Sequence, residues 1–162
     1  SREGGRIDRL DLATGAIVPV RSGRVLAPAA SPEGGVLFFT RLPEQSLGRH
    51  GESEVCRARP EDGPAEVLAR LANSRVPLAP RLHLHVSVSP DGRWLAAPLV
   101  DGTSVNIWLI PTDGGPMRAV TDFKERSVFI GRHVSWSPDS RYVYAAVADT
   151  SADIVRLEGL LG

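Results

Sequence analysis

The sequence is poor in cysteine, lysine and aromatic residues, and it has no long apolar run. Its single cysteine, Cys56, cannot form an internal disulfide, so a disulfide framework is excluded. Lysine occurs once, at Lys124, and arginine supplies the other basic side chains. No apolar stretch approaches the roughly 20 residues that a transmembrane helix needs, and no signal peptide is visible. The sequence therefore predicts no direct membrane contact and leaves the compartment unknown.

Neither sign of charge is in excess. The chain has 19 Lys and Arg residues and 19 Asp and Glu residues, so its formal net charge is zero. Binding of nucleic acid relies on neutralising phosphates, so a neutral chain without a basic tract argues against such a partner. The chain also lacks a Gly-x-Ser-x-Gly elbow, a phosphate-cradling glycine loop and a His-Glu-x-x-His sequence. We therefore expect a protein that is not an enzyme and uses no cofactor.

What the sequence does contain is a repeat. HVSVSPDGRWLAA begins at His85, and HVSWSPDSRYVYAA begins at His133, about 50 residues later. A weaker third copy, APAASPEGGVLFFT, begins at Ala27. A period of this length, built from short apolar strands around a turn, is typical of β-propeller blades. The sequence predicts an all-β chain of four-stranded antiparallel blades.

The repeat divides the chain into two complete blades and two partial ones, a single segment of a propeller. With strands A to D running outward from the propeller axis, the expected segments are 1–22 (strands C and D), 23–72 and 81–122 (complete blades), and 129–162 (strands A to C). The connection between strands B and C is longest in the first complete blade, from Thr40 to Glu54. Surface loops absorb insertions at low cost, so we expect the blades to tolerate deletion of Leu42 to Gly51.

Each repeat carries a Ser-Pro turn whose residues have separate physical roles. The two stronger copies consist of Ser89, Pro90, Asp91 and Gly92, and of Ser137, Pro138 and Asp139 followed by Ser140. Proline presets φ, serine and aspartate bond to local backbone amides, and glycine accepts the left-handed conformation that closes the hairpin. Ser140 replaces that glycine, and a positive φ there costs about 1 kcal/mol. We expect these serines to be structural and not nucleophilic.

Several residues are expected to pack between blades. Small side chains after two of the turns, Ala96-Ala97 and Ala145-Ala146, suit strands that are buried on both faces. The three tryptophans are the right size to fill the space between blades. Cys56 falls on an expected strand and is interpreted as a buried, inert thiol.

The stretch SVSPDGRWLAAPLVDGTSVNIWLIPTDGGPMRAVT resembles the TolB-like, or WD-like, β-propeller repeat. That family combines a Ser-Pro-Asp-Gly hairpin, an Asp/Asn-Ile-Trp/Tyr strand and a Gly-Gly turn leading to Leu/Val-Thr. The last three elements correspond to Asn106-Ile107-Trp108, Gly114-Gly115 and Val120-Thr121. The chain departs from the family pattern at Glu33, Cys56, Ser140 and Val155.

The resemblance implies a propeller that binds and does not catalyse. Such propellers occur in bacterial proteins, as periplasmic Tol components, as domains of prolyl-oligopeptidase-like enzymes, and as sensor domains of kinases and transcription regulators. The last repeat is similar to the C-terminal part of a sensor-type propeller. We therefore expect a binding or scaffold module for protein–protein or small-ligand recognition, within a larger bacterial sensor or regulatory protein. A gate domain that accompanies a prolyl-oligopeptidase-like serine hydrolase is the alternative.

Two complete blades and two partial blades are too few to close a ring of six to eight blades. Their outermost sheets would leave edges and faces without partners, which proteins avoid. Either upstream blades or a second copy of the chain would complete the ring, and a protein or peptide partner is expected as well.

Candidate binding residues gather at the expected mouth of the axial channel. His85 and His133 hold equivalent places four residues before a Ser-Pro turn, at the expected start of strand A. The other candidates lie before these strands or on the connections between strands B and C: Arg81, Arg132, Asp101, Asp149, Arg41 and His50. Such a set suits a small anion or a peptide terminus, whereas repeated histidines also serve to bond the backbone of their own blade. No metal site is expected, because neither a histidine pair on one element nor an acidic calcium loop is present.

Overall fold

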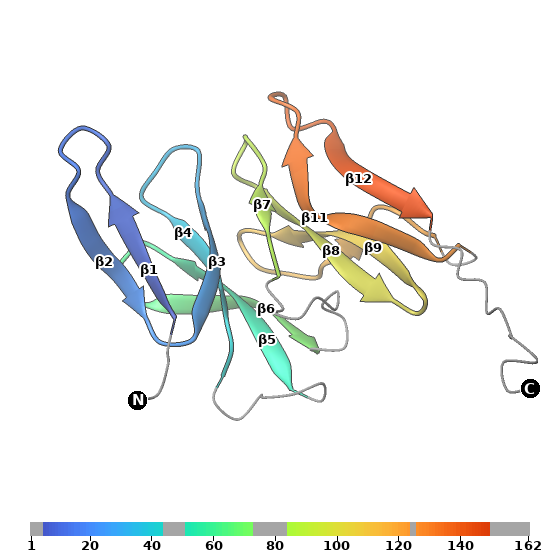
Figure 1. Cartoon of the computed structure of the whole chain (residues 1–162), viewed down its shortest axis with the longest axis horizontal. Helices are drawn as coiled ribbons and strands as arrows, with labels where there is room; N and C mark the ends of the chain where they lie inside the picture. Colours follow the sequence, from blue (N-terminus) through green and yellow to red (C-terminus); the bar gives the residue numbers. More distant parts are fainter. Residues whose placement is uncertain (1–4, 44–50, 73–83, 124–125, 150–162) are drawn as a thin grey trace, which may run out of the picture.

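A computed structural model describes residues 5–43, 51–72, 84–123 and 126–149, and all regular structure in these residues is β-strand. The strands are β1 (Arg6–Leu10), β2 (Ile17–Ser22), β3 (Val25–Ala30), β4 (Leu37–Arg41), β5 (Glu52–Ala58), β6 (Ala65–Ala72), β7 (Ser87–Val88), β8 (Trp94–Asp101), β9 (Ser104–Pro111), β10 (Arg118–Ala119), β11 (Val128–Trp136) and β12 (Val143–Asp149) (Figure 1). Within the described ranges, no helix has the length and apolar character needed to cross a membrane.

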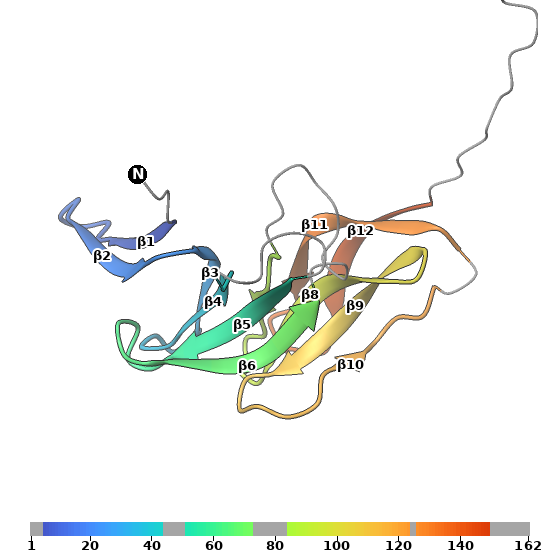
Figure 2. The same cartoon turned by 90° about the horizontal axis from the view of Figure 1, so that it is seen from below.

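The strands form four antiparallel sheets that follow one another in chain order (Figures 1 and 2). The first sheet is β1–β2, the second β3–β4–β5–β6, the third β7–β8–β9–β10 and the fourth β11–β12. The prediction of an all-β chain with four-stranded antiparallel blades is confirmed. Strand C of the last blade was expected in a segment that lies outside the described residues.

The first strands of the last three sheets lie side by side, since β7 contacts both β3 and β11. We refer to β3, β7 and β11 as the inner strands.

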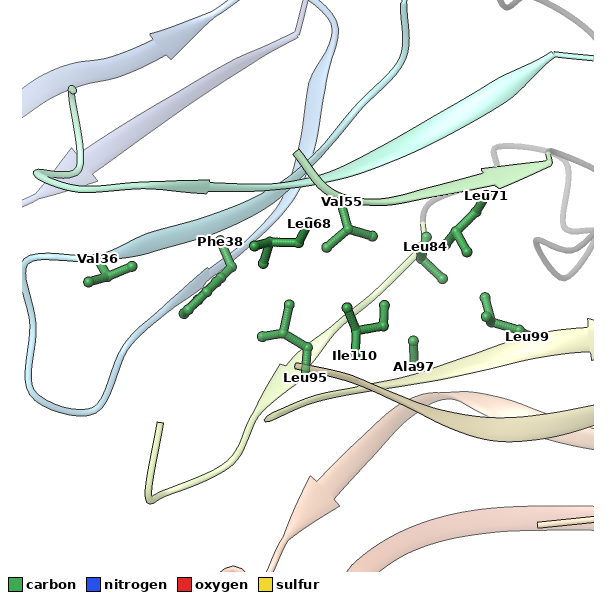
Figure 3. Close-up of a cluster of buried hydrophobic side chains, with 10 residues drawn as sticks. All are labelled: Val36, Phe38, Val55, Leu68, Leu71, Leu84, Leu95, Ala97, Leu99 and Ile110. Atoms are coloured by element: carbon green, nitrogen blue, oxygen red, sulfur yellow. The ribbon is translucent and has the colours of Figure 1, made fainter. Parts of the chain in front are cut away.

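The hydrophobic core is divided into three layers, each between two successive sheets. The middle layer joins the second and third sheets (Figure 3), and its buried members are Val36, Phe38, Val55, Leu68, Leu71, Leu84, Leu95, Ala97, Leu99 and Ile110. In Figure 3 the side chains of Phe38 and Leu68 approach those of Leu95 and Ile110 from the opposite sheet. The blades therefore stabilise each other by burying apolar surface face to face.

Strand β8 is buried on both faces, as its small side chains Ala96 and Ala97 predicted. Leu95 and Ala97 belong to the middle core layer, whereas Ala96 belongs to the layer between the third and fourth sheets. The corresponding expectation for Ala145-Ala146 was wrong. Ala145 packs against the last core layer, but Ala146 is exposed, because no described sheet covers the outer face of β12.

Three strand boundaries differ from those expected. Strand β4 reaches Arg41 and β5 begins at Glu52, so the long connection is shorter than the predicted range and most of it lies outside the described residues. Asp101, which was expected on a connection, ends β8 instead, because β8 and β9 pair as far as Asp101 and Ser104, and Gly102, with φ of 66°, closes this tight hairpin. Strand β11 was expected to start near His133, but it begins at Val128, because Val128 packs in the last core layer and pairs with β12.

The turns between β3 and β4, β7 and β8, and β11 and β12 are the Ser-Pro turns, and they point to the same edge in Figure 1. In the second turn the Ser89 hydroxyl donates to Asp91 Oδ1 at 2.5 Å and accepts the N–H of Trp94 at 3.0 Å. The third turn repeats both bonds at the equivalent residues. In the first turn Glu33 has the place of the aspartate, and the Ser31 hydroxyl donates to the Gly34 carbonyl instead.

Ser140 links two successive Ser-Pro turns. Its φ is 59°, the left-handed conformation expected for a residue in the glycine position. Its hydroxyl oxygen accepts the backbone N–H of Asp91, in the turn of the preceding blade, at 3.0 Å. A glycine would adopt this φ without strain but could not make this bond, so the hydroxyl offsets the strain by joining two blades.

Leu95→Ala should lower the free energy of unfolding by about 2 to 5 kcal/mol, because it leaves a cavity in the middle core layer. Leu95 is 0 % exposed, whereas Leu12 is 92 % exposed. Leu12→Ala deletes the same side-chain atoms at an exposed position, so it leaves no cavity and should change the free energy of unfolding by less than about 0.5 kcal/mol. Urea-induced unfolding of both variants measures the difference, and equal effects would contradict the core assignment.

Ser140→Ala and Ser140→Gly should differ in stability. Ser140→Ala keeps the left-handed strain and loses the bond to Asp91, so it should cost about 1 kcal/mol. Ser140→Gly loses the same bond but relieves about 1 kcal/mol of strain, so its stability should stay near that of the original chain. The free energies of unfolding in urea test this order, and an alanine variant as stable as the glycine variant would contradict it.

Candidate functional site

His85 and His133, the equivalent histidines of two successive repeats, lie in contact, His85 just before inner strand β7 and His133 within inner strand β11. Their ring centroids are 4.6 Å apart, and the ring planes are tilted by 55°. His85 lies two residues before β7 and is partly buried, whereas His133 is exposed. The contact places two imidazoles from different blades at one accessible point.

The structure corrects the expected position of His133 within its strand. It lies inside β11, at a shift of the strand register between Ile130 and Val134, and not at the strand's start. Register irregularities re-aim side chains, and they are common next to functional sites.

A hydrogen bond between two inner strands fixes the backbone on which the histidines lie. The indole Nε1 of Trp136, at the end of β11, donates to the Ser87 carbonyl of β7 at 2.9 Å. Trp136 also packs against the core layer between the third and fourth sheets. The bond therefore holds the two histidine-bearing segments in one relative position.

Arg41 is committed to a buried carboxylate. Its Nε and Nη2 lie 2.7 and 2.6 Å from Oε2 of Glu54, and Arg70 Nη2 lies 3.1 Å from the other oxygen. The Glu54 side chain is only 8 % exposed, and a buried carboxylate is costly unless it is paired. The hydrogen bond that Arg41 donates to Glu54 raises the pKa of Arg41 above its ordinary value. Arg41 thus neutralises Glu54 in this structure.

Asp149 pairs with Arg126, and Asp101 ends β8 with an exposed side chain. One guanidinium nitrogen, Nη2 of Arg126, lies 2.6 and 2.7 Å from the two carboxylate oxygens of Asp149. Both partners are exposed, so this pair is accessible to a competing ligand.

The three remaining candidate side chains lie outside the part of the chain that the structure describes. His50 and Arg81 lie outside the described residues, as does the side chain of Arg132, whose backbone is part of β11. Among the side chains that the structure describes, no group of three or more His, Cys, Asp and Glu is arranged to hold a metal ion.

Cys56 is buried in the first core layer, as expected for an inert thiol. Desolvation raises the pKa of its thiol to about 11, so the reactive thiolate is scarce at neutral pH.

Two hollows on the surface contain none of the candidate residues. One, of about 260 Å³, lies between the first sheet and the turn after β5, and Arg9 and Glu61 face each other across it with an ion pair of 3.2 Å. The other, of about 290 Å³, is lined by Arg57, Arg59 and Glu66. Sequence analysis missed these arginines, because isolated charges on predicted strands and turns carry no pattern.

The aspartates of two Ser-Pro turns, Asp91 and Asp139, have lowered pKa values. For Asp91 the main cause is the hydrogen bond from the Ser89 hydroxyl, and the backbone N–H of Arg93 also contributes. For Asp139 the Ser137 hydroxyl has the larger effect and the N–H of Arg141 a smaller one. Both turns are therefore held most firmly while the carboxylates are ionised.

Acid should weaken the fold through these turns. A folded-state pKa below the ordinary value near 3.8 gives stability that is present above that pH and is lost as pH falls through the folded pKa. Asp91→Asn with Asp139→Asn should reduce the loss of unfolding free energy between about pH 5 and pH 2. Ser89→Ala with Ser137→Ala should reduce it too, because the hydroxyl donors are removed. Urea unfolding over this pH range tests both pairs, and unchanged acid sensitivity would contradict the assignment.

No protein-family model and no curated protein sequence matches the chain. Solved structures do match. TolB from Acinetobacter baumannii aligns with 86% of this chain at a TM-score of 0.61 and 21% identity. A protein assigned as TolB from Agrobacterium tumefaciens aligns with 91% at a TM-score of 0.61 and 21% identity. The tricorn protease aligns with 98% at a TM-score of 0.58 and 19% identity.

The chain spans 34% of the first of these proteins, 51% of the second and 15% of the third. Similarity at this level of identity establishes the fold and leaves activity and partners open. The successive four-stranded sheets, the Ser-Pro turns along one edge and these structural matches agree: the chain has a TolB-like β-propeller fold.

Proposed function

We propose that the chain is a non-catalytic binding module, which takes a peptide or protein segment at the inner strands beside His85 and His133. The observation that carries the proposal is the contact between these two histidines, which come from equivalent places in successive blades. The rings are polar, and His133 is exposed to an approaching ligand. Each neutral imidazole offers one donor and one acceptor, which suits the backbone and the terminal groups of a peptide.

Two of the charged candidate residues are already paired, which favours recognition by hydrogen bonds over attraction by a strong electrostatic field. Arg41 is occupied by Glu54, and Asp149 is paired with Arg126. Asp101 adds an exposed carboxylate at the end of β8. With a formal net charge of zero, the chain has no overall field to attract a strongly charged partner.

The geometry of the Ser-Pro turns supports a non-catalytic role. A nucleophilic serine needs a hydroxyl that substrate can reach and an adjacent base. Ser89 is 0 % exposed and Ser137 is 5 % exposed, and each hydroxyl is bonded within its own turn. The alternative, a gate domain accompanying a prolyl-oligopeptidase-like serine hydrolase, has the fold of part of the tricorn protease in its favour. That likeness concerns the fold alone.

The outer faces of the first and fourth sheets give the proposed module further contacts. Leu10 and Ile17 are exposed on the first sheet, and Phe129, Tyr142 and Tyr144 are exposed at the outer face of the fourth. Clustered apolar side chains of this kind mark protein interfaces. Further blades or a second copy of the chain are the two candidates for covering them, as part of a larger bacterial sensor or regulatory protein.

Peptide selection tests the proposed site. A phage library of random decapeptides is selected on the full chain, and enriched peptides are synthesised and titrated by fluorescence anisotropy. We expect His85→Ala with His133→Ala to weaken these peptides at least tenfold while the circular dichroism spectrum and the melting temperature stay close to those of the original chain. Asp113→Ala, an exposed change in the β9–β10 turn, is the matched control and should bind normally.

Two outcomes would contradict the proposal. Peptides that bind the double histidine variant as well as the original chain would place the binding surface elsewhere. Loss of folding in that variant would show that the two histidines are structural.

A further inference from the structure

We propose that His85 and His133 together bind one divalent transition-metal ion, of the class of Ni²⁺, Cu²⁺ and Zn²⁺, and thereby link two successive blades. The proposal uses the histidine pair of the proposed function but requires no peptide. It also revises the expectation from sequence, which looked for paired histidines on a single element. Here the pair is formed by two elements that the fold brings together.

The spacing of the rings fits coordination of one ion. A metal–nitrogen bond of about 2.0 to 2.1 Å and a further 1.1 Å, roughly, to the ring centre put the ion about 3.2 Å from each centroid. Two imidazoles bound at about 90° then have centroids about 4.5 Å apart, and at the tetrahedral angle about 5.2 Å apart. The observed separation of 4.6 Å falls within this interval.

The orientation of the rings leaves room for the ion. Rings stacked in parallel would direct their nitrogens away from a common point, whereas planes tilted by 55° allow one nitrogen of each ring to converge. Rotation about χ2, which is a soft torsion for histidine, can turn one nitrogen of each ring toward a common point. The backbone positions are already held by the bond from Trp136 to Ser87, so binding orders little more than two side chains.

The chemistry of the pair selects the kind of ion. Imidazole nitrogen suits Ni²⁺, Cu²⁺ and Zn²⁺, whereas Ca²⁺ and Mg²⁺ prefer oxygen ligands. Because His133 is exposed, water can occupy the remaining coordination positions. A site with two protein ligands and open positions binds more weakly than a closed structural zinc site, and it can accept a further donor from a bound partner.

Titration with Ni²⁺ alone tests the inference. Isothermal calorimetry on the full chain should give one ion bound per chain. His85→Ala and His133→Ala should each weaken binding at least tenfold, since each removes one of two protein ligands. Asp113→Ala, an exposed change in the β9–β10 turn that leaves the pair intact, is the matched control, and it should bind as the original chain does.

A second measurement does not depend on the heat of binding. An ion held by two blades stabilises the folded state, so an excess of Ni²⁺ should raise the melting temperature of the original chain and of Asp113→Ala. It should not raise the melting temperature of His133→Gln, a conservative change at an exposed position that preserves side-chain polarity. Excess Mg²⁺ should leave both readouts unchanged.

Equal Ni²⁺ binding by the original chain and by the single variants at the pair would overturn the inference, as would the absence of binding to the original chain. This failure is distinguishable from failure of the proposed function. If nickel binds at the pair but no peptide is enriched, the metal site is supported and the peptide site is not. Selected peptides that depend on the pair, without nickel binding, would leave only the peptide site.

Discussion

The structure depends on one constraint: an apolar sheet cannot leave both of its faces in water. Strand β8 has Leu95 and Ala97 on one face and Ala96 on the other, and all three are fully buried. Because β8 belongs to the third sheet, that burial requires the second sheet on one of its faces and the fourth sheet on the other. Stacking of the sheets in chain order follows from it, and so do the three separate core layers. The apolar side chains left exposed on the first and fourth sheets mark where the described stack ends.

Stacking of sheets brings repeat-equivalent residues together, and polar contacts then set their relative position. The Thr40 hydroxyl donates to the Leu84 carbonyl at 3.1 Å, joining the second sheet to the segment that leads into β7. Trp136 and Ser87 join the inner strands of the next two sheets. Each bond ties a strand to the backbone of a neighbouring blade. A short repeat motif can thus build a composite site, because positions about 50 residues apart in the chain become neighbours in space.

The sequence predicted the features that are encoded locally. The Ser-Pro turn contains its own hydrogen-bonding groups, so its geometry at Ser89 and at Ser140 followed from the residues themselves. Features that depend on strand pairing were not accessible in this way. The position of His133 within β11 depends on how far β11 pairs with β12 beyond the register shift. The partner of Arg41 is its register neighbour Glu54, and the exposure of Ala146 depends on which sheet lies beyond β12.

The charged candidate residues and their partners differ in how readily a ligand could recruit them. Glu54 is buried between two arginines, and removing either partner would leave a poorly solvated carboxylate, so Arg41 is held in place. Arg126 and Asp149 are both more than half exposed, and such a surface pair contributes at most about 1 kcal/mol. A ligand donor can therefore replace Arg126 at Asp149 at little cost. Asp149 thus joins the exposed Asp101 and His133 as groups that a ligand can recruit, and the binding role that we propose would use them and not Arg41.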